Sequence, residues 1–339
     1  MHWTAIGRHH NAMRNRQIHT VRLRRSRDPR EARRISMTAP TEAPVPFRWD
    51  ITRPERLGSL LEGEAEDPGA RFFGLLLACA ARVIVLAGDS DLVFLGRSPE
   101  SLHDLLAGLL SETPWHNRLQ LLPFSTGYTT TAVARRKQPE VVAAFRQYLE
   151  SRQLSPAQLI VRERPVAIVD LICSGHTMNE FLLLLRDWAT EEQADWRAVQ
   201  RKLRVVGITR QADPEPTPRW HWKKRARPWL WRDHSSWVNE LLERGAVREV
   251  AASPALWTYL GDRQPKTMPS YTPERWGRYE ATQPDREERH LSALRLARRV
   301  FESGREPSAR RQFAALLASD APGAQHAWCR DLARAVRGG

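Results

Sequence analysis

The chain has 339 residues and 41% of them are hydrophobic, which excludes a chain that is disordered throughout. Three cysteines, Cys79, Cys173 and Cys329, lie far apart, which argues against a disulfide framework or a structural zinc site and indicates a reducing compartment. The net charge is +14, but ten Arg and two acids place +8 of it in residues 1–36, so the rest of the chain is only mildly basic.

Residues 1–45 form a basic and then Pro-rich leader. Residues 1–36 have no apolar periodicity and no apolar core of a secretory signal, which predicts disorder. Met37 begins the sequence MTAPTEAPVPF, which is typical of a translation start. We therefore interpret residues 1–36 as an upstream extension, in preference to an arm that binds nucleic acid or an anionic membrane.

The elements predicted after the leader begin with helices and short strands. In order they are a short helix at 53–61, a helix at 71–81, a strand at 82–87, a turn at 88–91 and a strand at 92–95. We expect Ser98 to cap the next helix and Pro99 to occupy its first position, where the missing N–H costs nothing. Leucines then recur with helical spacing at positions 102, 105, 106, 109 and 110.

Strands and helices continue to alternate further along the chain. The predicted elements are a strand at 118–123, a helix over 141–149, a strand at 166–170, a helix at 178–189 and a strand at 204–208. This alternation favours a mostly parallel sheet, and the continuous apolar runs are typical of strands that helices cover on both faces. We therefore expect an α/β domain at residues 46–213.

The most apolar run, residues 72–87, is interrupted by Arg82 and is shorter than the ~20 residues that a membrane-spanning helix needs. We therefore expect a soluble, cytoplasmic protein that does not enter a membrane.

Residues 214–283 differ in composition, because seven of the 13 Trp lie between positions 220 and 276. Aromatic and basic side chains alternate over residues 219–237, and three interpretations stay open: a compact cap on the α/β domain, a protein interface anchored by Trp, or a nucleic-acid surface. We favour the cap, and the mild charge of residues 37–339 argues against a dedicated nucleic-acid binder. Residues 284–339 are predicted to be helical.

Asp170 ends the strand at 166–170, and a loop with Ser174, Gly175 and Thr177 leads into the next helix. Open α/β sheets bind ligands at the carboxyl ends of their strands, and the N–H groups that begin a helix suit a phosphate. Gly175 permits close approach to the backbone, and the two hydroxyls can donate to phosphate oxygens. The Asp170 carboxylate can accept hydrogen bonds from sugar hydroxyls or help to hold Mg²⁺. The sequence therefore predicts a site for ribose 5-phosphate.

The stretch VAIVDLICSGHT, residues 166–177, resembles the PRPP-binding motif of type I phosphoribosyltransferases. That motif consists of an apolar strand, two acids, two apolar residues and a small Ser/Thr-Gly-x-Thr loop. In this resemblance Asp170 stands at the second acidic position. The phosphate loop is then formed by Cys173, Ser174, Gly175, His176 and Thr177. Val169 stands at the first acidic position, which is a departure from the family, and the motif covers only about a dozen residues.

The resemblance implies a transferase of nucleotide metabolism that displaces pyrophosphate from PRPP by a nitrogen nucleophile, with Mg²⁺ as cofactor. It implies that Asp170 is the acid of the catalytic site, where it holds the ribose and indirectly supports Mg²⁺. It also implies that Gly96, Arg97 and Ser98 meet the pyrophosphate, and the planar guanidinium of Arg97 suits such an anion.

Several alternatives stay open. Because Val169 replaces an acid of the family motif, the second hypothesis is a catalytically degenerate regulator or scaffold that binds a ribose phosphate. Nucleic-acid binding is the third hypothesis. Candidate partners are a phosphoribosyl small molecule, a protein at the Trp-rich region and a second copy of the chain in a homodimer. Less favoured sites are a Cys173–His176 nucleophile without a third orienting residue and a metal site at Asp89 and Asp91.

Overall fold

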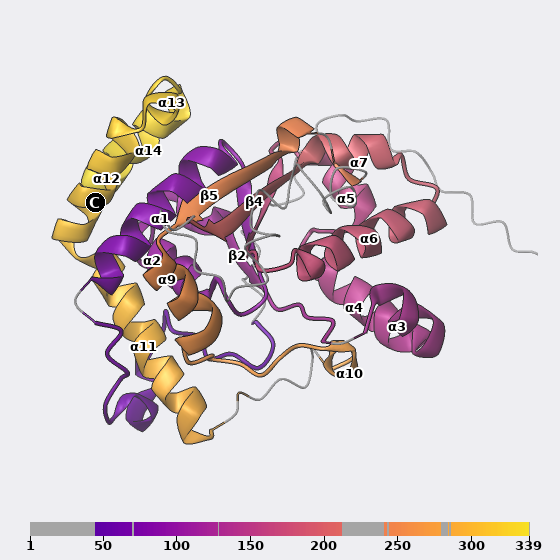
Figure 1. Cartoon of the computed structure of the whole chain (residues 1–339), viewed down its shortest axis with the longest axis horizontal. Helices are drawn as coiled ribbons and strands as arrows, with labels where there is room; N and C mark the ends of the chain where they lie inside the picture. The colour runs from indigo at the N-terminus through magenta and orange to yellow at the C-terminus, as the bar shows by residue number, and fades with distance from the viewer. Residues whose placement is uncertain are drawn as a thin grey trace, which may run out of the picture. The chain divides into compact units, whose positions relative to one another are not determined.

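Five parallel strands form one sheet in the described part of the chain, in the order β2-β1-β3-β4-β5 (Figure 1). The strands are β1 (Asp91–Leu95), β2 (Leu119–Leu122), β3 (Val166–Leu171), β4 (Leu203–Arg210) and β5 (Val247–Ala252). The structure is a computed structural model that describes residues 45–338 apart from 70, 128, 212–240, 243, 279–283 and 285. The chain divides into two compact units, Met1–Glu42 and Ala43–Gly339, and the described residues belong to the second. The parallel α/β class that the sequence predicts is therefore confirmed.

The chain reverses its direction across the sheet between β1 and β3, which are neighbours. β1 leads through α2 (Glu100–Leu109) to β2 on one side, whereas β3 leads through α6 (His176–Glu191) and α7 (Trp196–Lys202) to β4 on the other. The β1–β3 register pairs Phe94 with Val169, so the two strands end close together. Open α/β sheets bind ligands at such a switch point, outside the carboxyl ends of the strands.

Helices cover both faces of the sheet, as the continuous apolar runs of its strands predict (Figure 1). Along β3, Ala167 and Val169 enter one core and Val166 and Ile168 enter the other. The first core includes residues of α1 (Phe72–Ala87), α2, α11 (Glu288–Arg305), α12 (Pro307–Ser319) and α14 (Ala327–Gly338). The second includes residues of α3 (Thr131–Lys137), α4 (Pro139–Ser151), α5 (Pro156–Val161), α6, α7 and α10 (Pro273–Trp276).

The strand expected at 82–87 is wrong, because these residues complete one continuous helix, α1. Three β-branched residues, Val83, Ile84 and Val85, favour a strand by local preference. They nevertheless continue the apolar turns that begin at Phe72, and ten residues of α1 are buried. Its exposed face carries only small residues and Arg82, so the sequence has almost no polar face that would reveal the helix. Gly88 ends the helix with a φ of 69°.

Several other elements differ from the sequence-based expectation or were not expected. α2 begins at Glu100 with Pro99 at its N-cap, and Ser98 makes no capping hydrogen bond. Two 3₁₀ turns, η2 (Pro54–Arg56) and η3 (Gly58–Leu61), replace the short helix at 53–61. β5 is an edge strand that exposes Arg248, so it lacks the continuous apolar run that identified β3. The remaining short elements are η4 (Pro114–Arg118), η6 (Arg244–Ala246), α9 (Pro254–Thr258), the π-helix η7 (Tyr259–Arg263) and α13 (Ala321–Ala324).

The Trp-rich segment expected at 214–283 lies partly outside the described residues, which resume at 241. Its described part supplies β5, α9, η7 and α10. The helices predicted for residues 284–339 are confirmed as α11, α12 and α14. Within the described ranges, no helix combines the length and the apolar character needed to cross a bilayer.

Two glycines allow α2 and α11 to pack backbone against backbone. A Cβ atom on Gly108 would lie 2.0 Å from the carbonyl oxygen of Phe301, and one on Gly304 would lie 2.5 Å from that of Leu105. Real Cβ atoms do not approach carbonyl oxygens so closely, so both positions require glycine. This contact fixes the position of α2, which begins just after the loop that follows β1.

Candidate functional site

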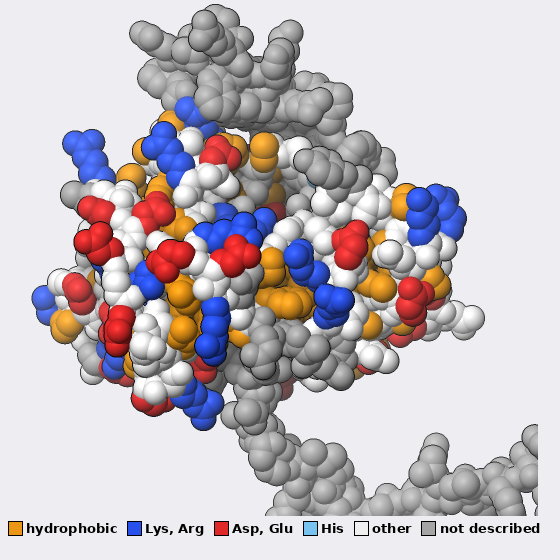
Figure 2. All heavy atoms as spheres, turned by 90° about the horizontal axis from the view of Figure 1, so that it is seen from below, with side chains coloured by type: hydrophobic (Ala, Val, Ile, Leu, Met, Phe, Trp, Pro, Cys, Tyr) orange, Lys and Arg blue, Asp and Glu red, His pale blue; other side chains and the backbone are white. Residues whose placement is uncertain are grey.

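A cavity of about 270 Å³ lies at the carboxyl ends of β1 and β3, at the switch point of the sheet. It is lined by all nine residues that the sequence singles out: Asp170, residues 96–98 and residues 173–177. Further lining comes from Phe124 and Ser125 after β2, and from the segment 261–271 after β5. Figure 2 views the molecule from below Figure 1 and shows Lys and Arg side chains around a hollow near the middle of that face. The two predicted loops therefore meet around one positively charged pocket.

The loop after β1 forms one wall of the pocket. Gly96 has a φ of 77°, and a Cβ atom there would lie 3.3 Å from the carbonyl oxygen of Phe124, so glycine relieves both strain and crowding. Arg97 is half-buried, and its Nη1 donates to the carbonyl oxygen of Met268 over 3.4 Å. Burial lowers the pKa of Arg97, the negative charge of Glu100 opposes this shift, and the positive charge of Arg275 adds to it.

Asp170 forms the floor of the pocket at the end of β3, with only 7% of its surface exposed. Burial raises the pKa of its carboxyl well above the usual range, and the backbone N–H of Leu171 offsets this only in part. None of the described cations pairs with this carboxylate. A ligand with hydroxyl groups would add hydrogen bonds to the one that the Leu171 N–H supplies.

The amino end of α6 forms the opposite wall. Gly175 occupies the N-cap in the left-handed conformation, with φ 76°, and no side chain caps the helix there. Ser174 Oγ lies 3.4 Å from the backbone N of His176, while no described side chain accepts from the N–H groups of Thr177 or Met178. Uncapped N–H groups and the helix dipole together attract an anion. Cys173 and Ser174 are exposed on this loop, and Thr177 is half-buried.

The segment after β5 adds a cation that the sequence did not single out, Lys266. Its Nζ donates to the carbonyl oxygen of Leu260 over 2.6 Å, and the residue lines the pocket. The pKa of Lys266 falls to about 8, because burial opposes its charge more than Glu100 supports it, while Arg97 repels it. Only the rarity of its residue type could have singled out Lys266 in the sequence. It is one of only five lysines in a chain whose 53 basic residues are otherwise Arg.

A buried polar network holds the Lys266 segment against α2. Glu100 Oε2 accepts hydrogen bonds from the N–H of Thr267 over 3.1 Å and from its hydroxyl over 2.5 Å. Arg48 Nε donates to the same hydroxyl over 3.0 Å, and Arg48 Nη2 contacts both carboxylate oxygens of Asp104 at 2.6 Å. All four residues are buried. The network thus fixes the backbone on either side of Thr267, and with it the position of Lys266.

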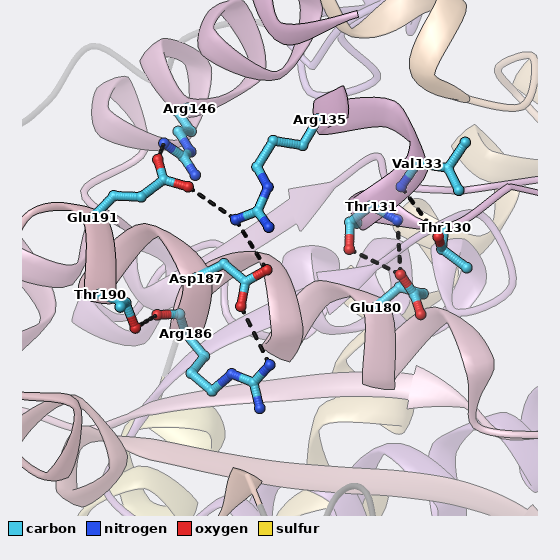
Figure 3. A network of polar contacts seen from close by, with 10 residues as sticks. All are labelled: Thr130, Thr131, Val133, Arg135, Arg146, Glu180, Arg186, Asp187, Thr190 and Glu191. Carbon is cyan, nitrogen blue, oxygen red and sulfur yellow. Dashed lines mark hydrogen bonds and ion pairs between the residues drawn. The ribbon is translucent and has the colours of Figure 1, made fainter. Parts of the chain in front are cut away.

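A second network ties α6 to α3 and α4 (Figure 3). The buried Glu180, in the second turn of α6, accepts from the N–H and the hydroxyl of Thr131, both over 2.8 Å, at the start of α3. Farther along α6, Arg135 pairs with Asp187 and Glu191 over 3.2 and 2.9 Å. The Glu180 contact holds the amino half of α6, and therefore its free N–H groups, beside the pocket, and the Arg135 pairs hold its carboxyl end.

The remaining candidates from the sequence, a metal site at Asp89 and Asp91 and the basic and aromatic run at 219–237, do not contribute to this pocket in the described residues. Asp89 pairs with Arg118 and Arg164, and Asp91 pairs with Arg162, so these carboxylates neutralise arginines. Over the described residues, no group of three His, Cys, Asp or Glu side chains is placed to hold a metal ion. The basic and aromatic run at 219–237 lies outside the described residues.

Val169 is fully buried in the core that contains residues of α1 and α2, on the face of β3 opposite to Ile168. The position therefore contributes to packing, and a carboxylate there would be buried without a partner.

Comparison of the chain with family models, curated proteins and solved structures finds no significant match.

Proposed function

We propose that the chain is a phosphoribosyltransferase-like protein that binds PRPP or another 5-phosphoribosyl compound in this pocket. One observation carries the proposal: the loop after β1 and the loop after β3 line one cavity at the switch point of the sheet. With the segment after β5, these loops bring together a buried carboxylate, an uncapped helix start and two cations, Arg97 and Lys266. These are the groups that a sugar with phosphates at separate positions requires.

Each part of such a ligand has a partner of suitable chemistry. The 5-phosphate binds the amino end of α6, where Thr177 and Ser174 add hydroxyl donors to the backbone N–H groups. The Asp170 carboxylate accepts hydrogen bonds from the ribose hydroxyls. Gly96 and Arg97 receive the pyrophosphate, since a guanidinium binds phosphate oxygens in pairs.

Mg²⁺ fits this arrangement only together with the ligand. Proteins commonly hold Mg²⁺ by one or two carboxylates and the phosphates of the substrate. Asp170 is the only carboxylate that lines the pocket among the described residues. It would therefore be the protein's contribution to the ion, which would balance the charge of the pyrophosphate.

A catalytically degenerate regulator is the second candidate, and Val169 favours it. Transfer to a nitrogen acceptor is the activity that the family resemblance implies, and it breaks the C1–O bond to pyrophosphate and forms a C1–N bond. The family places a carboxylate where Val169 is fully buried in an apolar core. Binding without turnover is the behaviour expected of such a protein.

Isothermal titration calorimetry of the full chain with PRPP, with and without Mg²⁺, tests the proposal. Replacing Asp170 and Thr177 together by Ala should weaken PRPP binding about 100-fold, since each removes contacts worth about 1–1.5 kcal/mol. Equal binding by this double variant, or no binding by the wild type, would refute the ligand class. Binding without pyrophosphate release over a panel of nucleobases and amines would favour the regulator.

An Asp170→Asn variant provides the control for folding. The folded-state pKa of Asp170 is raised above the unfolded value of about 3.9, so keeping the group ionised costs stability above pH ~4. We expect Asp170→Asn to resist urea at least as well as the wild type at pH 8, with an advantage that shrinks towards pH 4. This variant separates loss of binding from loss of fold, because its expected stability is not lower.

A further inference from the structure

Lys266 is the one lysine among the described residues that lines the pocket, and it also lines an adjoining cavity of about 380 Å³. Its side chain therefore lies where the two cavities meet. Its Nζ donates to the carbonyl oxygen of Leu260 over 2.6 Å and has no second acceptor among the described residues. The nitrogen is therefore available to a ligand that enters the pocket.

The main chain around Lys266 is held on both sides. Thr267 binds Glu100 through its N–H and its hydroxyl, and His290 Nδ1 lies 3.0 Å from the carbonyl oxygen of Lys266. Pro265 comes directly before Lys266, and the proline ring fixes its own φ. A rigid segment thus presents the amine to the pocket, which favours a reaction that depends on the position of the reacting groups.

The surroundings of Lys266 favour its neutral form. Its pKa falls to about 8, because burial opposes the charge and Arg97 repels it, while Glu100 and Asp262 offset these effects only in part. The other titratable residues that line the adjoining cavity are Arg275, Arg289 and His290. At pH 7 about a tenth of an amine with this pKa is neutral, against about 0.04% at the usual lysine pKa of about 10.4. The neutral amine is the nucleophilic form, and desolvation beside another cation is a known way to activate a lysine.

The contact with a carbonyl oxygen does not by itself distinguish Lys266 from other lysines. Lys202 on α7 is also half-buried, and it donates to the carbonyl oxygen of Arg162 over 2.5 Å. Lys202 lines neither cavity, whereas Lys266 shares the pocket with the buried carboxyl of Asp170 and with the uncapped start of α6. The combination of an amine, a carboxyl and an anion site in one cavity is therefore particular to Lys266.

We propose that Lys266 is a nucleophile that forms an imine with the carbonyl carbon of a phosphorylated aldehyde, such as the open-chain form of a pentose 5-phosphate. The phosphate binds the start of α6, and the aldehyde at the other end of the molecule meets Nζ. The nitrogen lone pair forms the N–C bond, the carbon–oxygen double bond breaks, and the oxygen leaves as water with the two hydrogens of the amine. Asp170 can pass a proton to the departing oxygen, since a carboxyl with a raised pKa keeps its proton to higher pH.

This reaction goes beyond the proposed function, although it uses the same phosphate position. PRPP cannot form the imine, because pyrophosphate occupies its C1. Ribose 5-phosphate has a free aldehyde at C1 when its ring is open. A protein with both properties would bind PRPP reversibly and the free sugar phosphate covalently.

Reductive trapping tests the reaction, because sodium cyanoborohydride converts an imine to a stable amine adduct. The full chain is incubated at pH 7 with ribose 5-phosphate and this reagent, and the labelled peptides are identified by mass spectrometry. Lys266 should be labelled at least about tenfold faster than Lys202, because more of its amine is neutral and positioned. The preference for ribose 5-phosphate over unphosphorylated ribose should be about tenfold greater at Lys266, since only there does the phosphate add a contact.

Lys266→Arg removes the amine but keeps a positive charge, so it should abolish the main adduct without changing urea unfolding. Lys202→Arg is the matched control and should leave the labelling of Lys266 within about twofold of the wild type. Equal labelling of Lys266 and Lys202, or the same phosphate preference at both, would overturn the proposal.

The two proposals fail separately. Calorimetric binding of PRPP without an adduct on Lys266 would leave the proposed function and remove the nucleophile. Selective labelling of Lys266 without any binding of PRPP would do the reverse.

Discussion

Arg48→Met is expected to destabilise the protein by about 3–5 kcal/mol, because it leaves the buried carboxylate of Asp104 without its arginine and with only His103 beside it. Arg48 Nη2 contacts both oxygens of Asp104 at 2.6 Å, and the two side chains are only 5% and 1% exposed. The same guanidinium donates to Thr267, so its loss should also loosen the segment that presents Lys266. Urea unfolding followed by Trp fluorescence measures the change.

The surface pair of Arg82 with Asp320 supplies the comparison. The Arg82 side chain is 45% exposed, and Arg82→Met should cost less than about 1 kcal/mol. The double variant Arg48→Met, Asp104→Leu should recover much of the loss, because replacing both partners removes the unpaired charge. If Arg48→Met cost no more than Arg82→Met, the network would not anchor the Lys266 segment.

Gly108→Ala should cost about 3 kcal/mol or more, an unusually large effect for the addition of one methyl group. The new Cβ would meet the carbonyl oxygen of Phe301 at 2.0 Å, and backbone atoms cannot turn away as a side chain can. α2 and α11 would have to separate, which opens the core between them. Thermal or urea unfolding measures the loss.

Gly74→Ala is the matched control. Gly74 is also a helical glycine, but it is exposed on α1 and a Cβ there has nothing within 4 Å. We expect this variant to be more stable than the wild type by about 0.5–1 kcal/mol, because alanine favours the helix. A Gly108→Ala variant with wild-type stability would show that the two helices do not pack as closely as described.

The fold class could be predicted from the sequence because the central strands are apolar without interruption. Residues 166–170 and 92–95 lie on the two neighbouring strands β3 and β1, whose apolar runs need no tertiary information to identify. Residues 82–87 present a similar run but belong to α1, because a short apolar run alone does not distinguish a strand from a largely buried helix. β5 was not predicted, because an edge strand exposes part of its surface and therefore lacks a continuous apolar run.

The candidate site could be predicted only where it depends on a local pattern. Asp170 and the following loop carry a recognisable order of residues, and Gly96 and Arg97 follow an apolar strand directly. Lys266 has no such local signal, because its position depends on Thr267 reaching Glu100, 167 positions earlier in the chain. Contacts of this separation arise from packing of the whole domain, which one sequence does not disclose.

The contact between α2 and α11 also has a consequence for synthesis on the ribosome. Gly108 packs against Phe301 and Gly304, which are nearly 200 residues later in the chain. At a synthesis rate of roughly 5–20 residues per second, α11 follows α2 after about 10–40 s. During this interval an apolar helix face that includes Leu105 and Leu109 stays without its final cover. The nascent chain should therefore be vulnerable to aggregation and to chaperone capture until its last helices have left the exit tunnel.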